Sequence, residues 1–472
     1  MVKEPVSPSL ETGSDDLRWL IDRFASGGDR RAFIHAGRCV TYSEIMRKIN
    51  QFALAVESQG IGRGDRVAMI ADYSPQVFCM LMALALRGAL VIPLGREAIV
   101  EQDNALRISG CEWIVEFDDE GLKSSIRRHV VEVDNALVSE FRTRRRPGLI
   151  LFTSGSTGKP KGILHDLVLV AEKFRKPRSP IVAIAFLMID HFGGINTILA
   201  ITSSLGTVIT VHDRSIDSIC RAIEESRVEL LPATPSFLTM LITSGRHREF
   251  DLSSLRRITY GTEVMPQSTL HRLCEAFPGV ELQQTYGLSE VGVLRSQSRA
   301  DGSLWVRLGG EGFETEIRDG ILWVRSKYAM VGYLNAGNPF DDEGWFNTQD
   351  RVEVDGEFFR ILGRTTDIIN VGGQKVYPAE VEDAILGMDN VADVAVTSES
   401  HPLLGQIVVA KIVTVEPESP ANLKKRVRSW CLGRLANYKV PSKVLVAEGS
   451  LYTVRQKKIR SNPGRRADVP SP

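Results

Sequence analysis

LILFTSGSTGKPKG, residues 149–162, joins an apolar run to a run that contains only Gly, Ser, Thr, Lys and Pro. The apolar part is typical of a buried strand. In the polar part, glycines let backbone N–H groups approach an anion, hydroxyl groups donate further hydrogen bonds, and Lys159 and Lys161 add positive charge. A strand that leads into so many donors favours a polyphosphate-binding loop over a plain flexible surface loop.

The spacing in this loop argues against two common nucleotide-binding patterns. A Walker loop needs a glycine, four further residues and then Gly-Lys-Ser/Thr at the start of a helix. Here Gly155 and Gly158 are only three positions apart, and Pro160 follows Lys159. The protein-kinase motifs H-R-D-L-x-x-x-N and D-F-G are absent from the sequence. A conventional P-loop NTPase or protein kinase is therefore disfavoured.

On both sides of the loop, short β-rich runs alternate with helical patterns, which indicates an α/β fold. Residues 66–94 predict a strand, a turn, a buried helix that begins near Pro75, and a second strand after Gly88. Residues 351–362 alternate like an antiparallel hairpin with a turn at Asp355-Gly356. From about residue 370 onward, a helix, two strands and a basic helix predict a small α/β domain of its own.

The chain length and the net charge further limit which kinds of protein this can be. A chain of 472 residues predicts two or three packed units. The 58 basic residues balance 58 acidic ones, so no overall charge attracts the chain to nucleic acid or to an anionic membrane. The apolar runs 78–86 and 181–189 are shorter than the ~18 residues that a membrane helix needs.

Two further features predict a cytoplasmic protein. The six cysteines are scattered, with no zinc-like spacing, which favours buried thiols in a reducing compartment over a disulfide framework. Residues 1–16 lack the apolar region of a secretory signal.

With this loop, the sequence resembles a known family, the adenylate-forming enzymes. The family includes acyl-CoA synthetases, peptide-synthetase adenylation domains and beetle luciferases. The loop is similar to the phosphate signature of that family. Further stretches resemble its other motifs in the expected order: QTYGLSE (284–290), GWFNTQD (344–350), GRTTDII (363–369) and GGQKVYPAE (372–380). The resemblance runs from about Ala32 to Arg460, nearly the whole chain.

The resemblance implies a large layered α/β N-terminal domain, residues 1–364, and a small mobile α/β C-terminal domain, residues 365–472. It implies an acid:CoA ligase that uses ATP, Mg²⁺ and coenzyme A. The substrate carboxylate attacks the α-phosphate of ATP to give an acyl-adenylate and pyrophosphate, and a thiol then attacks the activated carbonyl. Catalysis of this kind is mostly positioning and charge stabilisation.

The resemblance also assigns nucleotide-binding roles. Tyr286 stacks on adenine, Gln284 meets its exocyclic amine, Asp350 accepts hydrogen bonds from the ribose hydroxyls with help from Arg364, and Glu290 binds Mg²⁺. The full set of ATP- or AMP-binding candidates is Thr153, Ser154, Gly155, Ser156, Thr157, Gly158, Lys159, Lys161, Gly261, Thr262, Glu263, Gln284, Thr285, Tyr286, Gly287, Ser289, Asp350 and Arg364.

Other residues match the acyl, thiol and hinge positions of the family. The stretch MIDHFGG (188–194) places His191 beside the acyl pocket, although a lone histidine after an apolar run is more often a core residue. The predicted pocket walls look apolar, which indicates a hydrophobic carboxylic acid; they are His191, Gly194, Ile195 and Val291. The predicted CoA-side loop and hinge are Gly372, Gly373, Lys375 and Thr366.

Lys458 falls where the family has a late lysine that neutralises charge between the carboxylate and the α-phosphate. It is predicted to be catalytic, together with Glu290, Thr157 and His191. At an effective dielectric constant near 20, two unit charges 4 Å apart interact by roughly 4 kcal/mol.

Four departures from the family motifs bear on the efficiency of adenylation. Gln349 replaces a glycine, Lys457 replaces another, Thr366 replaces an acidic or basic pivot, and Asn370 replaces a common lysine.

The alternatives to a CoA ligase are a loader of a separate carrier protein, a thioester-forming partner fed with preformed adenylate, a luciferase-like oxygenase and a non-catalytic nucleotide-binding homologue. The oligomeric state and the identity of the acid do not follow from the sequence.

Overall fold

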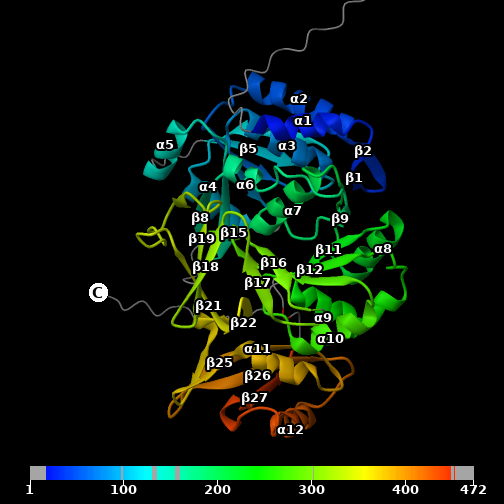
Figure 1. Ribbon diagram of the computed structural model, residues 1–472, viewed down its shortest axis with the longest axis vertical. Coiled ribbons are helices and arrows are strands. Elements are labelled where there is room, and N and C mark those ends of the chain that lie inside the picture. Colours follow the sequence, from blue (N-terminus) through cyan, green and yellow to red (C-terminus); the bar gives the residue numbers. More distant parts are fainter. Residues whose placement is uncertain are drawn as a thin grey trace, which may run out of the picture. The chain divides into compact units, whose positions relative to one another are not determined.

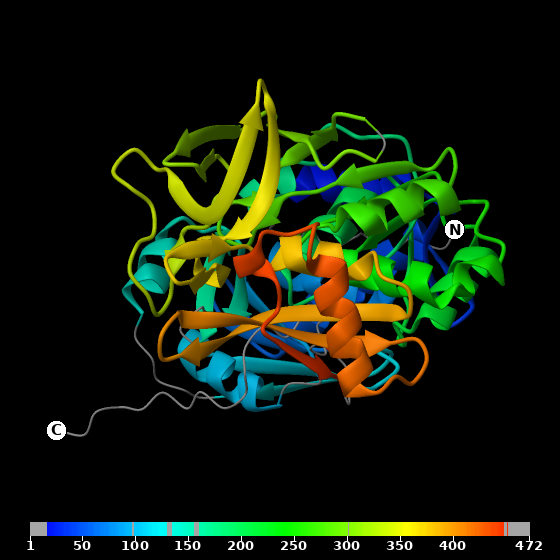
Figure 2. The ribbon, with the colours of Figure 1, turned by 90° about the horizontal axis from the view of Figure 1, so that it is seen from below.

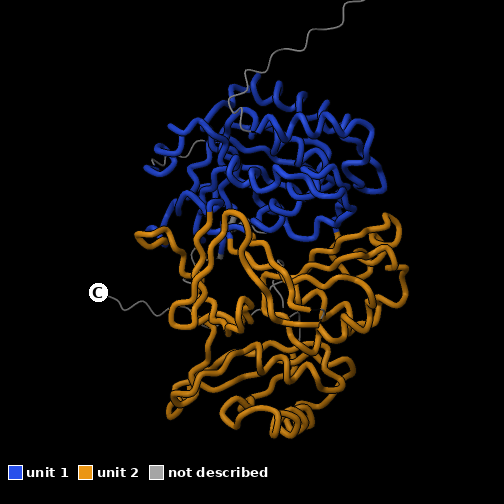
Figure 3. Tube along the Cα trace, viewed as in Figure 1, with its two compact units in different colours: residues 1–212, 289–292, 327–339 blue, residues 213–288, 293–326, 340–472 orange. Residues whose placement is uncertain are grey.

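A computed structural model describes residues 17–96, 99–129, 135–154, 160–300, 302–447 and 451. The chain divides into two compact units (Figure 3). Unit 1 comprises residues 1–212, 289–292 and 327–339, and unit 2 comprises residues 213–288, 293–326 and 340–472.

Unit 1 contains a seven-stranded sheet in the order β20-β8-β7-β4-β3-β5-β6. Strands β3, β4, β5 and β7 run parallel in this sheet, whereas β6, β8 and β20 are antiparallel to their neighbours. The strands are β3 (Arg66–Ile70), β4 (Leu90–Leu94), β5 (Trp113–Phe117), β6 (Ser124–Arg128), β7 (Gly148–Ser154), β8 (Pro160–Asp166) and β20 (Gly332–Tyr333).

The predicted strand–helix–strand unit of residues 66–94 is confirmed as β3, α3 and β4. Helix α3 begins because the Ser74 hydroxyl accepts a hydrogen bond from the Val77 N–H, and Pro75 fits the first helical position. Its residues are all buried apart from Gln76, as expected of a helix that is apolar on every side.

The first three helices of unit 1 pack in sequence order, α1 on α2 and α2 on α3 (Figure 1). A second group of strands pairs in the order β9-β10-β1-β2. These elements are α1 (Arg18–Ser26), α2 (Tyr42–Ser58), α3 (Pro75–Leu86), α4 (Ile99–Ser109), α5 (Ala136–Thr143), α6 (Leu167–Glu172), α7 (Phe192–Thr202), β1 (Arg31–His35), β2 (Arg38–Thr41), β9 (Val182–Ile184) and β10 (Thr207–Ile209).

Unit 2 begins with three parallel strands, β11, β12 and β13, that alternate with helices. An antiparallel sheet follows in the order β16-β17-β22-β21-β19-β18. The elements are α8 (Ile216–Ser226), α9 (Pro235–Ser244), α10 (Gln267–Ala276), β11 (Leu230–Ala233), β12 (Arg257–Tyr260), β13 (Glu281–Gln284), β16 (Arg295–Ser298), β17 (Val306–Gly309), β18 (Phe313–Arg318), β19 (Ile321–Ser326), β21 (Phe346–Asp355) and β22 (Phe358–Arg364).

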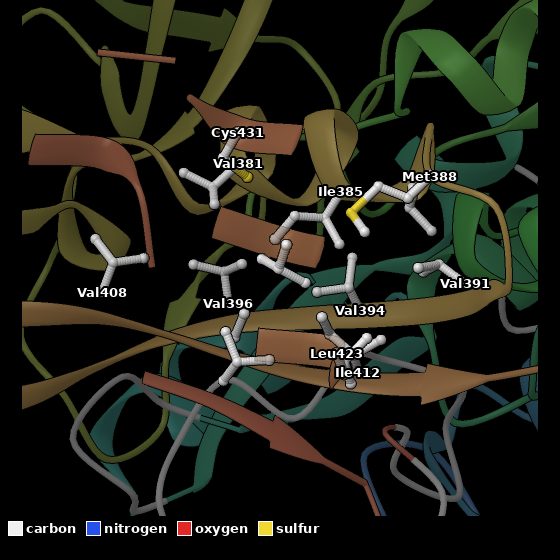
Figure 4. Close-up of a cluster of buried hydrophobic side chains, with 14 of the residues drawn as sticks. Val381, Ile385, Met388, Val391, Val394, Val396, Val408, Ile412, Leu423 and Cys431 are labelled. Carbon is white, nitrogen blue, oxygen red and sulfur yellow. The ribbon is translucent and has the colours of Figure 1, made fainter. Parts of the chain in front are cut away.

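The C-terminal part of unit 2 is a small α/β domain with its own core. Helices α11 and α12 pack against a sheet in which β25 and β26 form a long antiparallel pair (Figure 2). The core includes Val381, Ile385, Val396 and Val408, all of which are buried (Figure 4). The elements are β23 (Ile369–Val371), β24 (Gln374–Val376), α11 (Pro378–Leu386), β25 (Val391–His401), β26 (Gly405–Thr414), α12 (Pro420–Cys431) and β27 (Lys443–Val446).

The α/β class, with a large N-terminal and a small C-terminal domain, is thus confirmed. The predicted boundary at residue 364 lies within unit 2 and stays a prediction. All six cysteines are free thiols, but Cys39 is exposed and Cys274 is half-buried, so the expectation of buried thiols holds for only four. Among the described residues, no helix is long and apolar enough to cross a membrane.

Candidate active site

The predicted phosphate loop connects two antiparallel strands of unit 1. Thr153 of β7 pairs with Lys161 of β8, and Ser154 pairs with Pro160. The residues between them, Gly155, Ser156, Thr157, Gly158 and Lys159, lie outside the described residues. A strand–loop–strand hairpin differs from the strand–loop–helix arrangement of a Walker loop, as the glycine spacing predicted.

Asn335 holds the base of this hairpin. Its side-chain oxygen accepts a hydrogen bond from the Gly162 N–H at 3.0 Å, and its amide nitrogen donates to the Pro160 carbonyl at 2.9 Å. Lys161 lies between Pro160 and Gly162 in the chain, and its ammonium group lies 4.9 Å from the centre of the Tyr333 ring. The position of Lys161 is therefore set by residues that are distant in the sequence.

Glu290 is half-buried and accepts a hydrogen bond from the Tyr333 hydroxyl to Oε1 at 2.8 Å. Its backbone carbonyl accepts from the Met330 N–H at 2.8 Å. The described residues contain no cluster of three or more His, Cys, Asp or Glu side chains around a cation site. A single carboxylate still fits Mg²⁺, because this ion is commonly held by one or two carboxylates together with substrate phosphates.

In unit 2, the predicted adenine and ribose residues contact each other directly. The Tyr286 hydroxyl donates to Asp350 Oδ2 at 2.6 Å, and both side chains are buried. Burial raises the pKa of the Asp350 carboxyl, although the Tyr286 bond and the nearby Arg364 charge act in the opposite direction. Burial, followed by the Asp350 charge, raises the pKa of Tyr286 well above its usual value, so this hydroxyl remains a donor.

The backbone next to Asp350 shows what one departure from the family motif means, the replacement of a glycine by Gln349. Gln349 has a φ of +60°, in the left-handed region where glycine is favoured. Its N–H donates to the Asn347 side chain at 2.8 Å, and the Asp350 N–H donates to the Thr348 hydroxyl at 3.0 Å. These bonds hold the turn in place. Arg364 is exposed and its Nε lies 3.6 Å from Asp350 Oδ1.

Gln284 ends strand β13 and is buried. Its side-chain oxygen is buried and has no hydrogen-bond partner among the described residues. A buried acceptor without a donor is costly unless a ligand supplies one. This feature agrees with the predicted contact to the exocyclic amine of adenine, which is a hydrogen-bond donor.

The segment from Gly261 to Glu263 is tightly constrained. A Cβ atom at Gly261 would lie 2.4 Å from the Thr285 hydroxyl and 2.7 Å from its carbonyl oxygen. Thr262 has a φ of +72°, which is a true outlier for a β-branched residue. Glu263 accepts hydrogen bonds from the hydroxyl and the N–H of Ser236, in the first turn of α9. Strain of this kind gathers at ligand-binding positions.

Three of the predicted acyl-pocket residues, His191, Gly194 and Ile195, lie at the start of α7. His191 is the N-cap residue of this helix, and its Nε2 lies 4.0 Å from Asp190 Oδ1. Phe192 packs against His165 with ring centres 4.8 Å apart. Burial lowers the pKa of His165 to about 4, so this ring is neutral at physiological pH.

Other predicted pocket residues are more enclosed than the sequence suggested. Ile195 and Val291 are fully buried. A Cβ atom at Gly194 would lie 2.0 Å from the Met188 carbonyl oxygen and 2.6 Å from the Tyr73 hydroxyl. Only glycine fits there, and polar groups stand beside the apolar walls that the sequence predicted.

The predicted CoA-side loop is the turn between β23 and β24. Gly372 and Gly373 have φ values of +56° and +87°, which this two-residue turn requires. The Gly373 N–H donates to the Asn370 side chain at 2.9 Å, and Lys375 is exposed. Asn370 thus stabilises the turn from the position where lysine is common. Thr366 is exposed within a short helical turn, Thr365–Asp367.

The structure therefore brings three pairs of predicted site residues together. Tyr286 is hydrogen-bonded to Asp350, Thr285 lies against Gly261, and Thr153 pairs with Lys161 across two strands. Lys458 and its neighbour Lys457 lie outside the described residues. A cavity of about 630 Å³ in unit 2, lined by residues that include His247, Arg272 and Met388, contains none of the predicted site residues.

Sequence reasoning missed Tyr333 and Asn335. They lie in GYLN (332–335), outside every motif that was recognised. The only local signal was a strand-like Gly332-Tyr333-Leu334 run that ends at an asparagine. Nothing in that signal indicates the partner residues.

Two family models match the chain. The model for AMP-binding enzymes matches residues 21–334, and the model for the C-terminal domain of AMP-binding enzymes matches residues 380–458. Similar curated proteins include a feruloyl-CoA synthase of Amycolatopsis sp and an indoleacetate–CoA ligase of Aromatoleum aromaticum. Each is 27% identical, over 90% and 91% of this chain respectively and 94% of the relative.

Similar solved structures share the fold. An anthranilate CoA ligase in complex with anthranoyl-AMP matches with a TM-score of 0.78 at 19% identity, over 93% of this chain and 95% of the other. An o-succinylbenzoate CoA synthetase of Bacillus subtilis in complex with its acyl-adenylate intermediate matches with a TM-score of 0.74 at 22% identity, over 94% and 96%.

Proposed function

Since the chain belongs to the family of AMP-binding enzymes, we propose that it is an ATP-dependent ligase that activates a carboxylic acid as an acyl-adenylate and transfers the acyl group to coenzyme A. The observation that carries the proposal is the buried Asp350 carboxylate, oriented by Tyr286 and flanked by Arg364. A carboxylate in this arrangement suits a ribose diol, since its remaining lone pairs can accept from two hydroxyl groups. The named CoA ligases among its relatives support the choice of thiol.

In the first step an oxygen of the substrate carboxylate attacks the α-phosphorus of ATP. The new O–P bond forms as the bond to the pyrophosphate oxygen breaks. Lys161 and Lys458 are proposed to offset negative charge on the phosphates. Glu290 would hold Mg²⁺, whose contribution is to neutralise phosphate charge.

In the second step a thiol attacks the acyl carbonyl, and AMP leaves with the electrons of the broken C–O bond. Gly372, Gly373 and Lys375 are proposed to meet the thiol donor, with Thr366 as the hinge of the C-terminal domain. Three residues at the start of α7, His191, Gly194 and Ile195, are proposed to bind the acyl group together with the buried Val291.

The substrate is proposed to be a hydrophobic, aryl or aliphatic, carboxylic acid. Because the reaction consumes ATP and coenzyme A, we place it in the cytoplasm. Release of pyrophosphate with a panel of acids, with and without coenzyme A, tests the activity. Preference for short polar acids such as acetate would contradict the substrate class. Acyl transfer only to a carrier protein, with none to coenzyme A, would contradict the proposal that coenzyme A is the acyl acceptor.

Lys458 offers a sharper test of the first step, the formation of the acyl-adenylate. Loss of a preorganised charge-stabilising group typically slows a step by about 10²–10³-fold. Lys458→Ala should therefore lose most acid-dependent pyrophosphate exchange yet still convert supplied acyl-adenylate and coenzyme A to thioester. Lys457→Ala is the matched control. If Lys457→Ala alone lost exchange, the assignment would move by one residue, and a wild type without any exchange would leave only the thioester-forming step.

A further inference from the structure

A short segment of unit 1, residues 330–335, contacts both the phosphate hairpin and Glu290. Strand β20 extends the sheet beside β8, with Gly332 opposite Leu164 and Tyr333 opposite Ile163. The Leu334 N–H continues the ladder by donating to the Gly162 carbonyl at 2.8 Å. The backbone of this segment thus runs along the second strand of the hairpin as far as the loop base.

The side chain at the end of the segment fixes the hairpin. Asn335 accepts from the N–H of Gly162 and donates to the carbonyl of Pro160, so its amide spans the residues on either side of Lys161. The contact is specific for a carboxamide, because one group must supply both an acceptor and a donor. An aspartate could not make the bond to Pro160.

The side chain two residues earlier fixes Glu290. The Tyr333 hydroxyl donates to Glu290 Oε1, and the Met330 N–H donates to the Glu290 backbone carbonyl. Lys161 lies over the face of the same Tyr333 ring. One tyrosine therefore contacts the predicted metal ligand through its hydroxyl and a predicted phosphate-binding lysine through its ring.

We propose that Tyr333 and Asn335 are positioning residues that tie Glu290 to the phosphate hairpin, so that the Glu290 carboxylate and the Lys161 ammonium group are held in fixed positions for binding Mg·ATP. The proposal rests on the proposed function in so far as Mg·ATP is the ligand. Partners that orient a metal-binding carboxylate typically change metal affinity 10–100-fold when they are removed. The hydroxyl of Tyr333 is such a partner, since it satisfies one carboxylate oxygen and leaves the negative charge in place.

The competing explanation is that the segment only completes the sheet. The backbone pairing of β20 would then matter, whereas the hydroxyl and the carboxamide would affect stability alone. Tyr333→Phe separates the two explanations because it keeps the strand, the ring and the contact with Lys161 and removes the hydroxyl that donates to Glu290. Tyr438→Phe is the matched control: Tyr438 is also half-buried with a lysine, Lys439, over its ring at 5.8 Å, and it lies in the C-terminal domain.

The experiment measures binding of Mn²⁺ to the full-length protein with ATP by electron paramagnetic resonance, and binding of metal-free ATP by calorimetry. Tyr333→Phe should weaken Mn²⁺ binding about tenfold and leave the affinity for metal-free ATP unchanged. Asn335→Ala should weaken ATP binding with and without the metal, because it loosens the hairpin itself. Asn335→Asp provides a second test with little change in volume and should behave like the alanine variant.

Wild-type Mn²⁺ affinity in Tyr333→Phe would overturn the proposal, whether or not its melting temperature falls. An equal loss in Tyr438→Phe would overturn it as well, because the effect would then not depend on Glu290. A wild-type protein that binds no Mn·ATP would contradict the proposed function itself. The two failures are thus distinguishable.

Discussion

Replacing Tyr286 with phenylalanine tests the buried contact on which the proposed nucleotide site depends. The change removes one hydroxyl, which donates to Asp350 at 2.6 Å, and keeps the ring. Hydrogen bonds to charged groups contribute about 1.5–3 kcal/mol, and the buried carboxylate loses a donor that water cannot replace. Tyr286→Phe should therefore lower the free energy of unfolding by about 2 kcal/mol at pH 8.

The pH dependence of this loss is the diagnostic result. Burial raises the pKa of Asp350 above its usual value, so the carboxyl destabilises the fold increasingly as the pH rises through that raised pKa. The Tyr286 bond favours the ionised form and opposes this effect. Its contribution is therefore present above the pKa of Asp350 and is lost as the pH falls through it. The difference between wild type and variant should therefore be largest well above the pKa of Asp350 and shrink as the pH falls through it.

Urea unfolding at several pH values measures both quantities. Tyr42→Phe is the control, because the buried Tyr42 hydroxyl donates to a neutral acceptor, the Gly206 carbonyl, at 2.8 Å. It should cost about 1 kcal/mol at every pH. If the loss in Tyr286→Phe were equally independent of pH, Asp350 would not be the charged partner that the geometry indicates.

Three further changes test local features of unit 2. Gln349→Gly should leave the protein between zero and about 1 kcal/mol more stable in urea unfolding, because glycine relieves the left-handed backbone; a clear loss would contradict this. Gly261→Ala should abolish AMP binding measured by calorimetry, since its Cβ would overlap Thr285; an unchanged affinity would place the nucleotide elsewhere. Asp383→Ala should cost about 0.5–2 kcal/mol of unfolding free energy, because Asp383 accepts from the N–H and hydroxyl of Ser268 in the first turn of α10; no loss in urea unfolding would show that this cap is not used.

The sequence was a good guide to the elements of the fold. In residues 66–94, turn residues and apolar runs act locally, and the predicted strand, helix and strand all form there. The hairpin at Asp355-Gly356 also forms, because Gly356 adopts a φ of +61° that the turn needs. Features of this kind depend on residues a few positions apart, so the pattern contains the necessary information.

The contacts within the candidate site were not predictable in the same way. Tyr286 meets Asp350 across 64 positions, Tyr333 meets Glu290 across 43, and Asn335 meets Gly162 across 173. Motifs identify which residues carry chemistry but not which side chains orient them. Gln349 shows the same limit, since the sequence revealed an unusual residue and only the backbone angle gave its consequence.

The carboxylates of Asp350 and Glu290, which are proposed to act on the ribose and on Mg²⁺, share one kind of hydrogen-bond partner. Asp350 and Glu290 each accept a hydrogen bond from a tyrosine hydroxyl, at 2.6 and 2.8 Å. By contrast, Glu112 pairs closely with Arg66 and Arg142. A guanidinium neutralises the carboxylate that it orients, and this suits a residue whose task is to connect two segments.

A tyrosine hydroxyl orients a carboxylate without cancelling its charge, because the donor is neutral. That difference matters where the charge must act on a ligand. A carboxylate already paired at close range with an arginine would attract Mg²⁺ weakly, since the cation would have to displace a charged partner. Arg364, exposed and 3.6 Å from Asp350, screens only part of that charge. Each of these tyrosines therefore fixes its carboxylate and leaves it charged, which suits Glu290 to the proposed role with a cation and Asp350 to the proposed role with a ribose.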